Sequence, residues 1–207
     1  MPPWKKAQRV FVTADTHFGD DVAFGKFARP FPNVEAMDRA LVAAINERVR
    51  PKDILLHLGD FSGELEWTKS RRTWLRGLRD RIECRTIVLV RGNVDPLDEH
   101  WFDGMFESVH DLITWKTRVG ETAERPMRVV ASHYPMRQWQ GWLNGALHLY
   151  GHVHGTLPED GRSTDVGVDC WSYAPVDLSS LLRMLAARPF ERPTTWPRQQ
   201  PMRSAMT

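Results

Sequence analysis

Short apolar runs alternate along the first half of the chain with longer segments in which apolar residues recur every three or four positions. The short runs are rich in Val, Ile and Leu, which is typical of buried strands. They lie at 10–14, 54–58 and 87–90. An alternation of strands and helices favours a parallel sheet, because parallel neighbours need a crossover connection between them.

Two segments between these runs have helical spacing. In 33–49 the apolar positions lie three or four apart, and Asn33 can cap the first turn. The apolar face of this helix is expected to contain Met37, Leu41, Ala44, Ile45 and Val49. A second helix is predicted at 65–78, with Trp67, Trp74 and Leu78 on its apolar side.

The second half of the chain is richer in strands, which predicts a mixed or second sheet. Strands are expected at 109–114, 128–132, 146–152 and 164–168. Asp177 can cap a last helix over 178–187. Residues 188–207 contain four prolines and several Arg and Gln residues, so we expect a single domain over 1–187 and an extended tail over 188–207.

The composition fits one soluble domain. The chain has 207 residues, 42% of them hydrophobic, and its net charge of +2 gives no global attraction to nucleic acid or membranes. Its two cysteines, Cys84 and Cys170, argue against a disulfide scaffold. No apolar segment follows the basic N-terminal residues, and no run approaches the ~20 apolar residues of a membrane span. We therefore expect a cytoplasmic protein, with its oligomeric state unknown.

Polar residues follow five of the predicted strands, where ligands of α/β sheets gather. Seven residues at these strand ends have side chains that bind metals: Asp15, His17, Asp60, Asn93, His133, His152 and His154. Each motif alone also fits a turn or a buried polar residue. Five of them in one chain favour a metal site over five separate accidents.

The order of these motifs, D-x-H, GD, GN, a single H and GHxH, resembles that of the calcineurin-like metallophosphoesterases. The sequence around the motifs is similar to the sequences of a small bacterial and phage branch of that superfamily. The similar stretches are DTHFG, RPF, HLGDF, RGN-x-D, SHYPM, YGHVHG and DVGVD. The resemblance covers residues 9–183. It implies an α/β class fold, a four-layer α/β/β/α sandwich with two mixed sheets.

The resemblance also implies two metal ions at one edge of the sandwich. By motif, the first ion would be held by Asp15, His17, Asp60 and His154. Asp60 would bridge to the second ion, whose other ligands would be Asn93, His133 and His152. Mixed nitrogen and oxygen donors suit Mn, Fe, Zn, Ni or Co better than Mg or Ca, and we favour Mn.

Such a centre predicts a phosphohydrolase, in which a hydroxide bridging two metals attacks phosphorus in line. The expected catalytic residues are Asp60, Asn93 and His133. Asn93 and Arg137 are expected to contact the substrate. Arg137 follows a ligand strand and can pair with a phosphate through two parallel hydrogen bonds.

Val94 departs from the family pattern. Many relatives read GNHD, where the His protonates the leaving oxygen, whereas this chain has Val94 before Asp95. General acid catalysis contributes about 10²–10⁴-fold in rate, and valine has no proton to give. We therefore expect a small phosphodiester with a leaving group that needs little help. Otherwise Asp20, Asp95, His100 or a metal-bound water would have to donate the proton.

Three other functions stay open. A phosphomonoesterase or a nucleotide or pyrophosphate hydrolase would use the same centre. A metal-stabilised scaffold protein with little turnover is the alternative from another class, although all seven candidate ligands are retained. A nuclease for long nucleic acid, which we do not favour, would bind the phosphate backbone with a basic stripe. The alternative interpretation of this stripe is a solvated helix face. This stripe contains Lys69, Arg72, Arg76 and Arg79, with Arg71 and Arg81 beside it.

Four histidines and two tryptophans lie outside the set of candidate ligands. His57 and His148 are expected to pack in strands, and His100 and His110 to lie at the surface. Trp139 and Trp142 flank a glycine after His133, so they are either an apolar wall for a base or aryl group, or packing residues.

Overall fold

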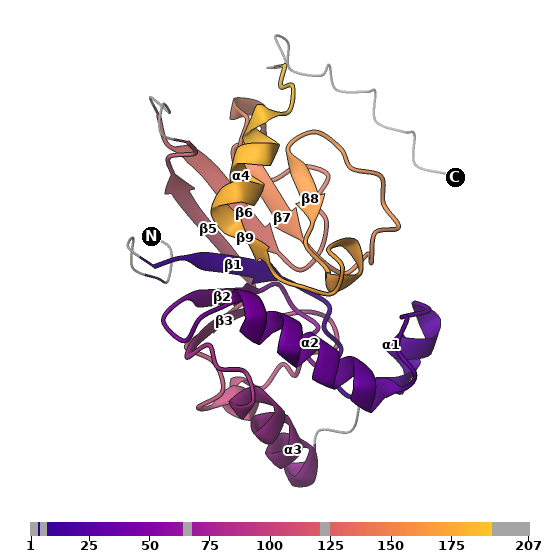
Figure 1. Ribbon diagram of the computed structural model, residues 1–207. Helices are drawn as coiled ribbons and strands as arrows, with labels where there is room; N and C mark the ends of the chain where they lie inside the picture. The colour runs from indigo at the N-terminus through magenta and orange to yellow at the C-terminus, as the bar shows by residue number, and fades with distance from the viewer. Residues whose placement is uncertain (1–3, 5–7, 64–67, 121–124, 192–207) are drawn as a thin grey trace, which may run out of the picture.

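The computed structural model describes residue 4 and residues 8–63, 68–120 and 125–191 (Figure 1). A first sheet has the strand order β4-β3-β2-β1-β9, with β1 to β4 parallel and β9 antiparallel. Its strands are β1 Val10–Thr13, β2 Ile54–His57, β3 Thr86–Val90, β4 Ser108–His110 and β9 Val176–Asp177.

A second sheet has the order β5-β6-β7-β8, with β5 antiparallel to β6 and the other pairs parallel. Its strands are β5 Leu112–Thr117, β6 Met127–Ser132, β7 Leu147–Tyr150 and β8 Ser163–Asp165. Both sheets are mixed and flanked by helices, which confirms the α/β fold class predicted from the motifs.

The helices are α1 Asp21–Lys26, α2 Val34–Arg48, α3 Lys69–Asp80 and α4 Leu178–Ala187, and the short 3₁₀ helices are η1 Glu99–Phe102, η2 Trp142–Asn144 and η3 Val168–Cys170. α2 and α3 pack on the face of the first sheet that points away from the second sheet, whereas α4 packs against β1, β9 and β7 (Figure 1). No helix in the described ranges is long and apolar enough to cross a membrane.

Alternation along β1 explains how the layers pack. Val12 belongs to a buried cluster with Leu147 of the second sheet and Leu181 of α4. Its neighbour Phe11 points to the opposite face and is buried with Met37 of α2. The first sheet is therefore apolar on both faces, as expected for parallel strands between two layers.

One expectation about a strand is wrong, one about a cap is confirmed in its position only, and one helix was not predicted. The strand expected at 109–114 is two strands, because the chain turns at Asp111 from β4 in the first sheet to β5 in the second. Asp177 occupies the N-cap position of α4, but its side chain caps no backbone amide. The additional helix α1 has six residues, too few for a recognisable period, and the Asp20 carboxylate caps its first turn.

The helix predicted at 65–78 is also shifted. α3 begins at Lys69 after the Thr68 cap, and the predicted start with Trp67 lies outside the described residues. Its buried face contains Leu75 and Leu78, whereas Trp74 is 39% exposed. Trp74 is therefore not a core residue, and its ring instead stacks under the Arg71 guanidinium.

The basic stripe of α3 is largely engaged in structure. Arg79 is buried and donates to the backbone carbonyl of Met105, among others. Arg72 and Arg76 donate to backbone carbonyls in 100–103. These arginines hold the loop after β3 against α3. Arg79 is therefore not part of a solvated face, whereas Lys69 and Arg76 remain exposed, as expected for such a face.

His148 is a buried neutral imidazole, in line with its predicted packing role, which it shares with the equally buried His57. Its Nδ1 atom lies 3.2 Å from the carbonyl oxygen of Val130, and its Nε2 atom accepts from the Met136 amide at 3.2 Å. Burial lowers the pKa of His148 from 6.5 to about 4.

Acidification should therefore destabilise the protein through His148. The unfolded chain binds the proton more tightly, so stability present above pH 6.5 is lost as the pH falls towards 4, by about 2 kcal/mol at pH 5. We expect His148→Gln to lower the free energy of unfolding at pH 7.5 by about 1–3 kcal/mol, and this deficit to shrink by about 2 kcal/mol at pH 5. Urea unfolding with a chelator present measures both values. An equal deficit at both pH values contradicts the prediction.

The predicted tail is described only at its start. Arg188 donates to the carbonyl of Ser163 and pairs with Glu159 at 2.6 Å, and the Arg162 guanidinium lies over the Phe190 ring. Residues 192–207 lie outside the described residues.

Candidate metal centre

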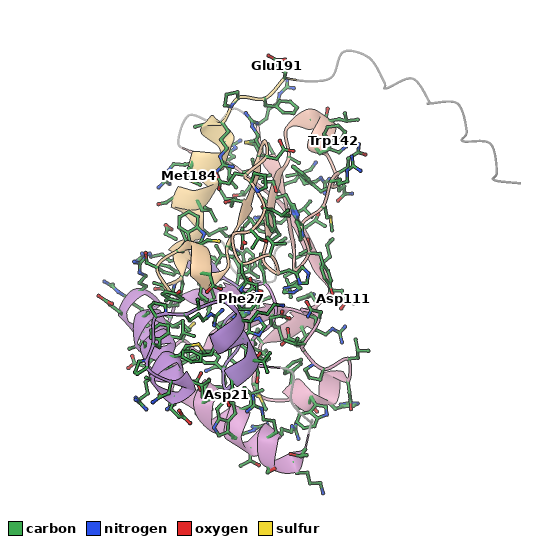
Figure 2. All side chains as sticks on the ribbon, turned by 90° about the vertical axis from the view of Figure 1, so that its right-hand side faces the viewer. Asp21, Phe27, Asp111, Trp142, Met184 and Glu191 are labelled. Carbon is green, nitrogen blue, oxygen red and sulfur yellow. The ribbon has the colours of Figure 1, made fainter. Side chains whose placement is uncertain are left out.

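The carboxyl ends of β1, β2, β3, β6 and β7 meet at one edge of the molecule. Backbone hydrogen bonds join the loops that follow these strands. The Asp15 amide donates to the Gly59 carbonyl at 3.0 Å, and the Gly151 amide donates to the His133 carbonyl at 2.9 Å. Figure 2 looks on to this edge, with Phe27 near its centre.

Six of the seven predicted ligands form two clusters at this edge, and the candidate ligand atoms within each cluster lie within 4.8 Å of one another. The first cluster is Asp15, His17 and His154, and the second is Asp60, His133 and His152. The seventh residue, Asn93, lies beside the second cluster, with its Oδ1 atom 3.0 Å from the Nε2 atom of His133 and 2.8 Å from the Nδ1 atom of His152. Each cluster combines residues that follow strands of both sheets.

The backbone around the clusters is strained. Eight non-glycine residues in the described ranges have a positive φ, and five of them are candidate ligands. These are Asp15 at 57°, His17 at 48°, Asp60 at 53°, His152 at 73° and His154 at 49°. Such conformations cost on the order of 1–3 kcal/mol each and gather at functional sites, so the strain itself points to function here.

Glycines in the GD and GN motifs make room for the ligands. A Cβ atom on Gly92 would lie 2.1 Å from Oδ1 of Asp60, and one on Gly59 would lie 2.6 Å from Nδ1 of His133. Gly59 also has a φ of +95°, which other residues rarely adopt. Both glycines are therefore required by close packing against candidate ligands.

Three histidines are oriented by an acceptor on Nδ1. The Nδ1 atom of His17 lies 3.0 Å from a carboxylate oxygen of Asp20, and that of His154 lies 2.7 Å from a carboxylate oxygen of Asp169. The Nδ1 atom of His133 lies 2.8 Å from the Leu58 carbonyl oxygen. An Nδ1–H bound in this way leaves Nε2 as the free lone pair, which is the usual arrangement of metal-binding histidines.

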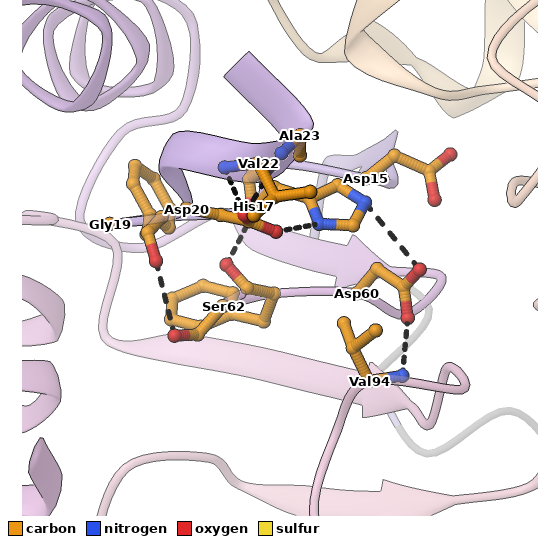
Figure 3. Close-up of polar contacts among 12 residues, drawn as sticks. Asp15, His17, Gly19, Asp20, Val22, Ala23, Asp60, Ser62 and Val94 are labelled. Carbon is orange, nitrogen blue, oxygen red and sulfur yellow. Dashed lines mark hydrogen bonds and ion pairs between the residues drawn. The ribbon is translucent and has the colours of Figure 1, made fainter. Parts of the chain in front are cut away.

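The orphaned Nε2 atom of His17 fits this arrangement. It is buried and has no hydrogen-bond partner among the described residues, while a carboxylate oxygen of Asp60 lies 3.5 Å away (Figure 3). A buried lone pair facing carboxylates needs a proton or a cation. The residues present therefore fit divalent ions with nitrogen and oxygen ligands.

A supporting network behind His154 was missed by sequence reasoning. The Asp169 carboxylate that holds His154 also accepts two hydrogen bonds from Arg29, at 3.0 and 2.8 Å. The Arg29 side chain is fully buried and also donates to the backbone carbonyls of Asp15 and Thr16. The only sequence signal for this contact was the presence of Arg29 in RPF and of Asp169 in DVGVD. From the sequence, Asp20, three residues after His17, is expected only as a proton donor.

We expect Asp169→Asn to weaken the binding of one metal ion about 10–100-fold, as is typical when such a supporting carboxylate is removed. The side-chain amide of the asparagine has no negative charge, so it would hold the His154 Nδ1–H and the Arg29 guanidinium less strongly than the carboxylate does. Calorimetric titration of metal-free protein with Mn²⁺ would resolve the two binding events. Asp177→Asn is the control at a carboxylate away from the clusters. Equal weakening of both ions would contradict the prediction.

Charges in the second cluster are coupled. Burial acts to raise the pKa of Asp60, but the hydrogen bond and charge of His133 outweigh it and lower that pKa. The same pairing overcomes the burial of His133 and raises its pKa. Burial also raises the pKa of Asp15 well above its ordinary value. Cations that bind here therefore displace protons.

The predicted alternative proton donors are occupied or distant. Asp95 is buried, and its carboxylate accepts from the backbone amides of Asp60, Phe61 and Gly92. Burial raises its pKa to about 6, yet both its oxygens face the backbone. Asp20 holds His17 and caps α1 (Figure 3).

Three further predicted groups are partly or fully exposed. His100 is exposed and pairs with Asp103. Arg137 is exposed, and its expected contact with the substrate stays a prediction. Trp139 stacks on His148 and donates to a backbone carbonyl, so it is a packing residue.

Trp142 lies in η2, before the amino end of β7, and Figure 2 places it far from Phe27. Arg91 pairs with Asp111 and donates to the Leu97 carbonyl, so it supports the loop after β3.

The chain is similar to several known proteins. Over 183 residues the chain is 27% identical to an uncharacterized protein of Methanocaldococcus jannaschii, a match that covers 86% of this chain and 92% of the relative. A solved structure of a protein of unknown function from Aquifex aeolicus has a TM-score of 0.61 at 18% identity, covering 86% of this chain and 99% of that one. The nuclease MPE of Pseudomonas putida has a TM-score of 0.43 at 21% identity, covering 74% and 65%.

A family model gives the assignment that the motif order predicted. The model of the calcineurin-like phosphoesterases matches residues 8–121, which is more than half of the 207 residues. The match includes the D-x-H, GD and GN motifs that contribute to both clusters. The chain therefore belongs to the calcineurin-like phosphoesterase family and is a metal-dependent phosphoester hydrolase.

Proposed function

We propose that the protein is a dinuclear phosphodiesterase that acts on a small phosphodiester. Asp15, His17 and His154 would hold one ion, and Asn93, His133 and His152 would hold the other. Asp60 would contribute to both. The position of Asp60 supports this assignment, because its Oδ2 atom lies 3.5 Å from Nε2 of His17 and 3.3 Å from Nε2 of His133, facing both clusters at once.

Two divalent ions, for which we favour Mn, would supply the positive charge that polarises the phosphoryl group and makes water nucleophilic near neutral pH. The chain's own residues fix the geometry of the centre. The Val94 amide donates to Oδ1 of Asp60 at 3.1 Å and holds the carboxylate in place. The exposed Asn93 points its Oδ1 atom at His133 and His152, so its NH₂ group is turned outward and can donate to a phosphoryl oxygen.

The observation that favours a diester is the absence of an acid at position 94. Figure 3 shows the Val94 side chain beside Asp60, where a donor in many relatives would stand. Asp20 and Asp95, the nearby carboxyl groups expected to replace it, are held by a histidine and by backbone amides. A substrate whose leaving group departs without a proton suits such a site.

The test compares bis(p-nitrophenyl) phosphate with p-nitrophenyl phosphate on metal-stripped protein refilled with Mn, Ni, Zn or Mg. We expect metal-dependent turnover that favours the diester in kcat/KM. Preference for the monoester would support the monoesterase alternative and require another donor. Absence of turnover with two bound ions would favour the scaffold alternative.

A further inference from the structure

Two aromatic side chains border the clusters, Phe27 and Tyr134, and they differ in how much of the ring remains available to a ligand. The Phe27 ring stacks on the His154 imidazole with centroids 3.4 Å apart, and the Lys26 ammonium also lies over this ring, 5.2 Å from its centroid. Phe27 is therefore committed to holding His154 in place. Tyr134 is placed differently.

Tyr134 directly follows His133 and remains 50% exposed. Its ring lies edge-to-face with two candidate ligands, with centroids 5.0 Å from His133 and 4.7 Å from His152. The Ser132 hydroxyl donates to the Tyr134 carbonyl at 2.9 Å and fixes the turn. The phenol hydroxyl has no hydrogen-bond partner in the part of the chain that the structure describes. The ring is thus fixed beside the centre with much of its surface in water.

We propose that the exposed face of Tyr134 binds a flat aromatic ring carried by the substrate. This inference rests on the proposed function, because the phosphoryl group must sit at the clusters to bring its substituent to Tyr134. A centroid distance near 5 Å from both His133 and His152 can be spanned by one phosphoester linkage. An aromatic substituent gains offset stacking beyond its apolar burial, whereas an alkyl group gains burial alone.

The surroundings favour the same class of substituent. Val94 adds an apolar side chain beside Asp60 of the second cluster, and Trp139 and Trp142, expected as an aromatic wall, lie elsewhere. Tyr134 therefore takes the place predicted for those tryptophans. The rings that fit this description are an aryl group and a nucleobase, which share the same stacking chemistry.

The experiment measures binding of three phosphonates to the metal-loaded full chain by calorimetry. Phenylphosphonate is compared with cyclohexylphosphonate, which has a similar apolar size, and with methylphosphonate. We expect phenylphosphonate to bind about tenfold more tightly than methylphosphonate, and more tightly than cyclohexylphosphonate. Tyr134→Ala should abolish this advantage and Tyr134→Phe should keep it. Met184→Ala, at an exposed apolar residue of α4 far from this edge in Figure 2, should change nothing.

Three results would overturn the inference: equal binding of phenyl and cyclohexyl groups, an unchanged ratio in Tyr134→Ala, or no binding of any phosphonate. Ring-dependent binding without hydrolysis of any diester would defeat the proposed function and leave the inference standing. Diester hydrolysis without ring dependence would do the reverse. Adenosine monophosphate compared with ribose phosphate identifies the source, since dependence on Tyr134 in that pair assigns the ring to a nucleobase.

Discussion

Asp60→Asn is expected to abolish turnover and release metal at the same time. The loss of one electrostatic contact in an active site already costs about 10²–10³-fold in kcat, and Asp60 would contact both ions, so we expect a fall on the order of 10³-fold or more. Asparagine keeps the shape of the side chain and the hydrogen bond from the Val94 amide, so the fold should survive. Elemental analysis for bound metal and kcat measured with excess Mn²⁺ would check both effects.

Asp103→Asn serves as the matched control, because Asp103 is exposed and pairs only with the exposed His100 among the described residues. It should retain two ions and full activity. A thermal melt of the two metal-free variants separates misfolding from loss of ligand. Full activity of Asp60→Asn with two bound ions would refute the assignment of Asp60 as the bridging ligand.

Val94→His is expected to raise kcat/KM for alkyl phosphate monoesters and leave aryl substrates nearly unchanged. A general acid contributes about 10²–10⁴-fold, and we expect the lower end, near 10²-fold. The reason is that the carboxylate of Asp95 already accepts from the amides of Asp60, Phe61 and Gly92, so it has little capacity left to orient the new imidazole. Kinetics with alkyl and aryl phosphates as a function of pH would measure the gain.

Val94→Gln is the control for size and polarity, since an amide fills similar space but donates no proton to a leaving group. The gain in Val94→His should also fade as the pH rises through the range in which the imidazole loses its proton. An equal effect of the two substitutions, or no gain on alkyl esters, would show that proton donation is not what position 94 lacks.

The sequence could predict the location of the centre because its information is local. Each motif ends a strand, and parallel strands bring their carboxyl ends to one edge, so the order of Asp15, Asp60 and Asn93 along the chain was sufficient. The structure brings all seven residues together, and their binding of metal stays a prediction. The split at Asp111 was hidden, since strands of two different sheets have the same apolar period.

The supporting contacts could not be predicted, because they join distant segments. Arg29 and Asp169 are 140 positions apart, and no local spacing connects them. The position of Tyr134 against two histidines depends likewise on how β6 and β7 pair. Asp20 was within reach of sequence reasoning, because a carboxylate three residues after a histidine at a turn can hold its ring.

Both candidate clusters take residues from each of the two sheets, and this has a consequence for the whole molecule. A bound ion would be a cross-link between sheets that already meet through apolar packing and through polar contacts such as that between His133 Nδ1 and the Leu58 carbonyl. Occupancy at a hundred times the dissociation constant stabilises a folded state by about 2.7 kcal/mol for each such ion. The strain in the ligand loops would be offset in the same step. Metal supply would then govern how firmly the two halves of the sandwich hold together, as well as whether the enzyme turns over.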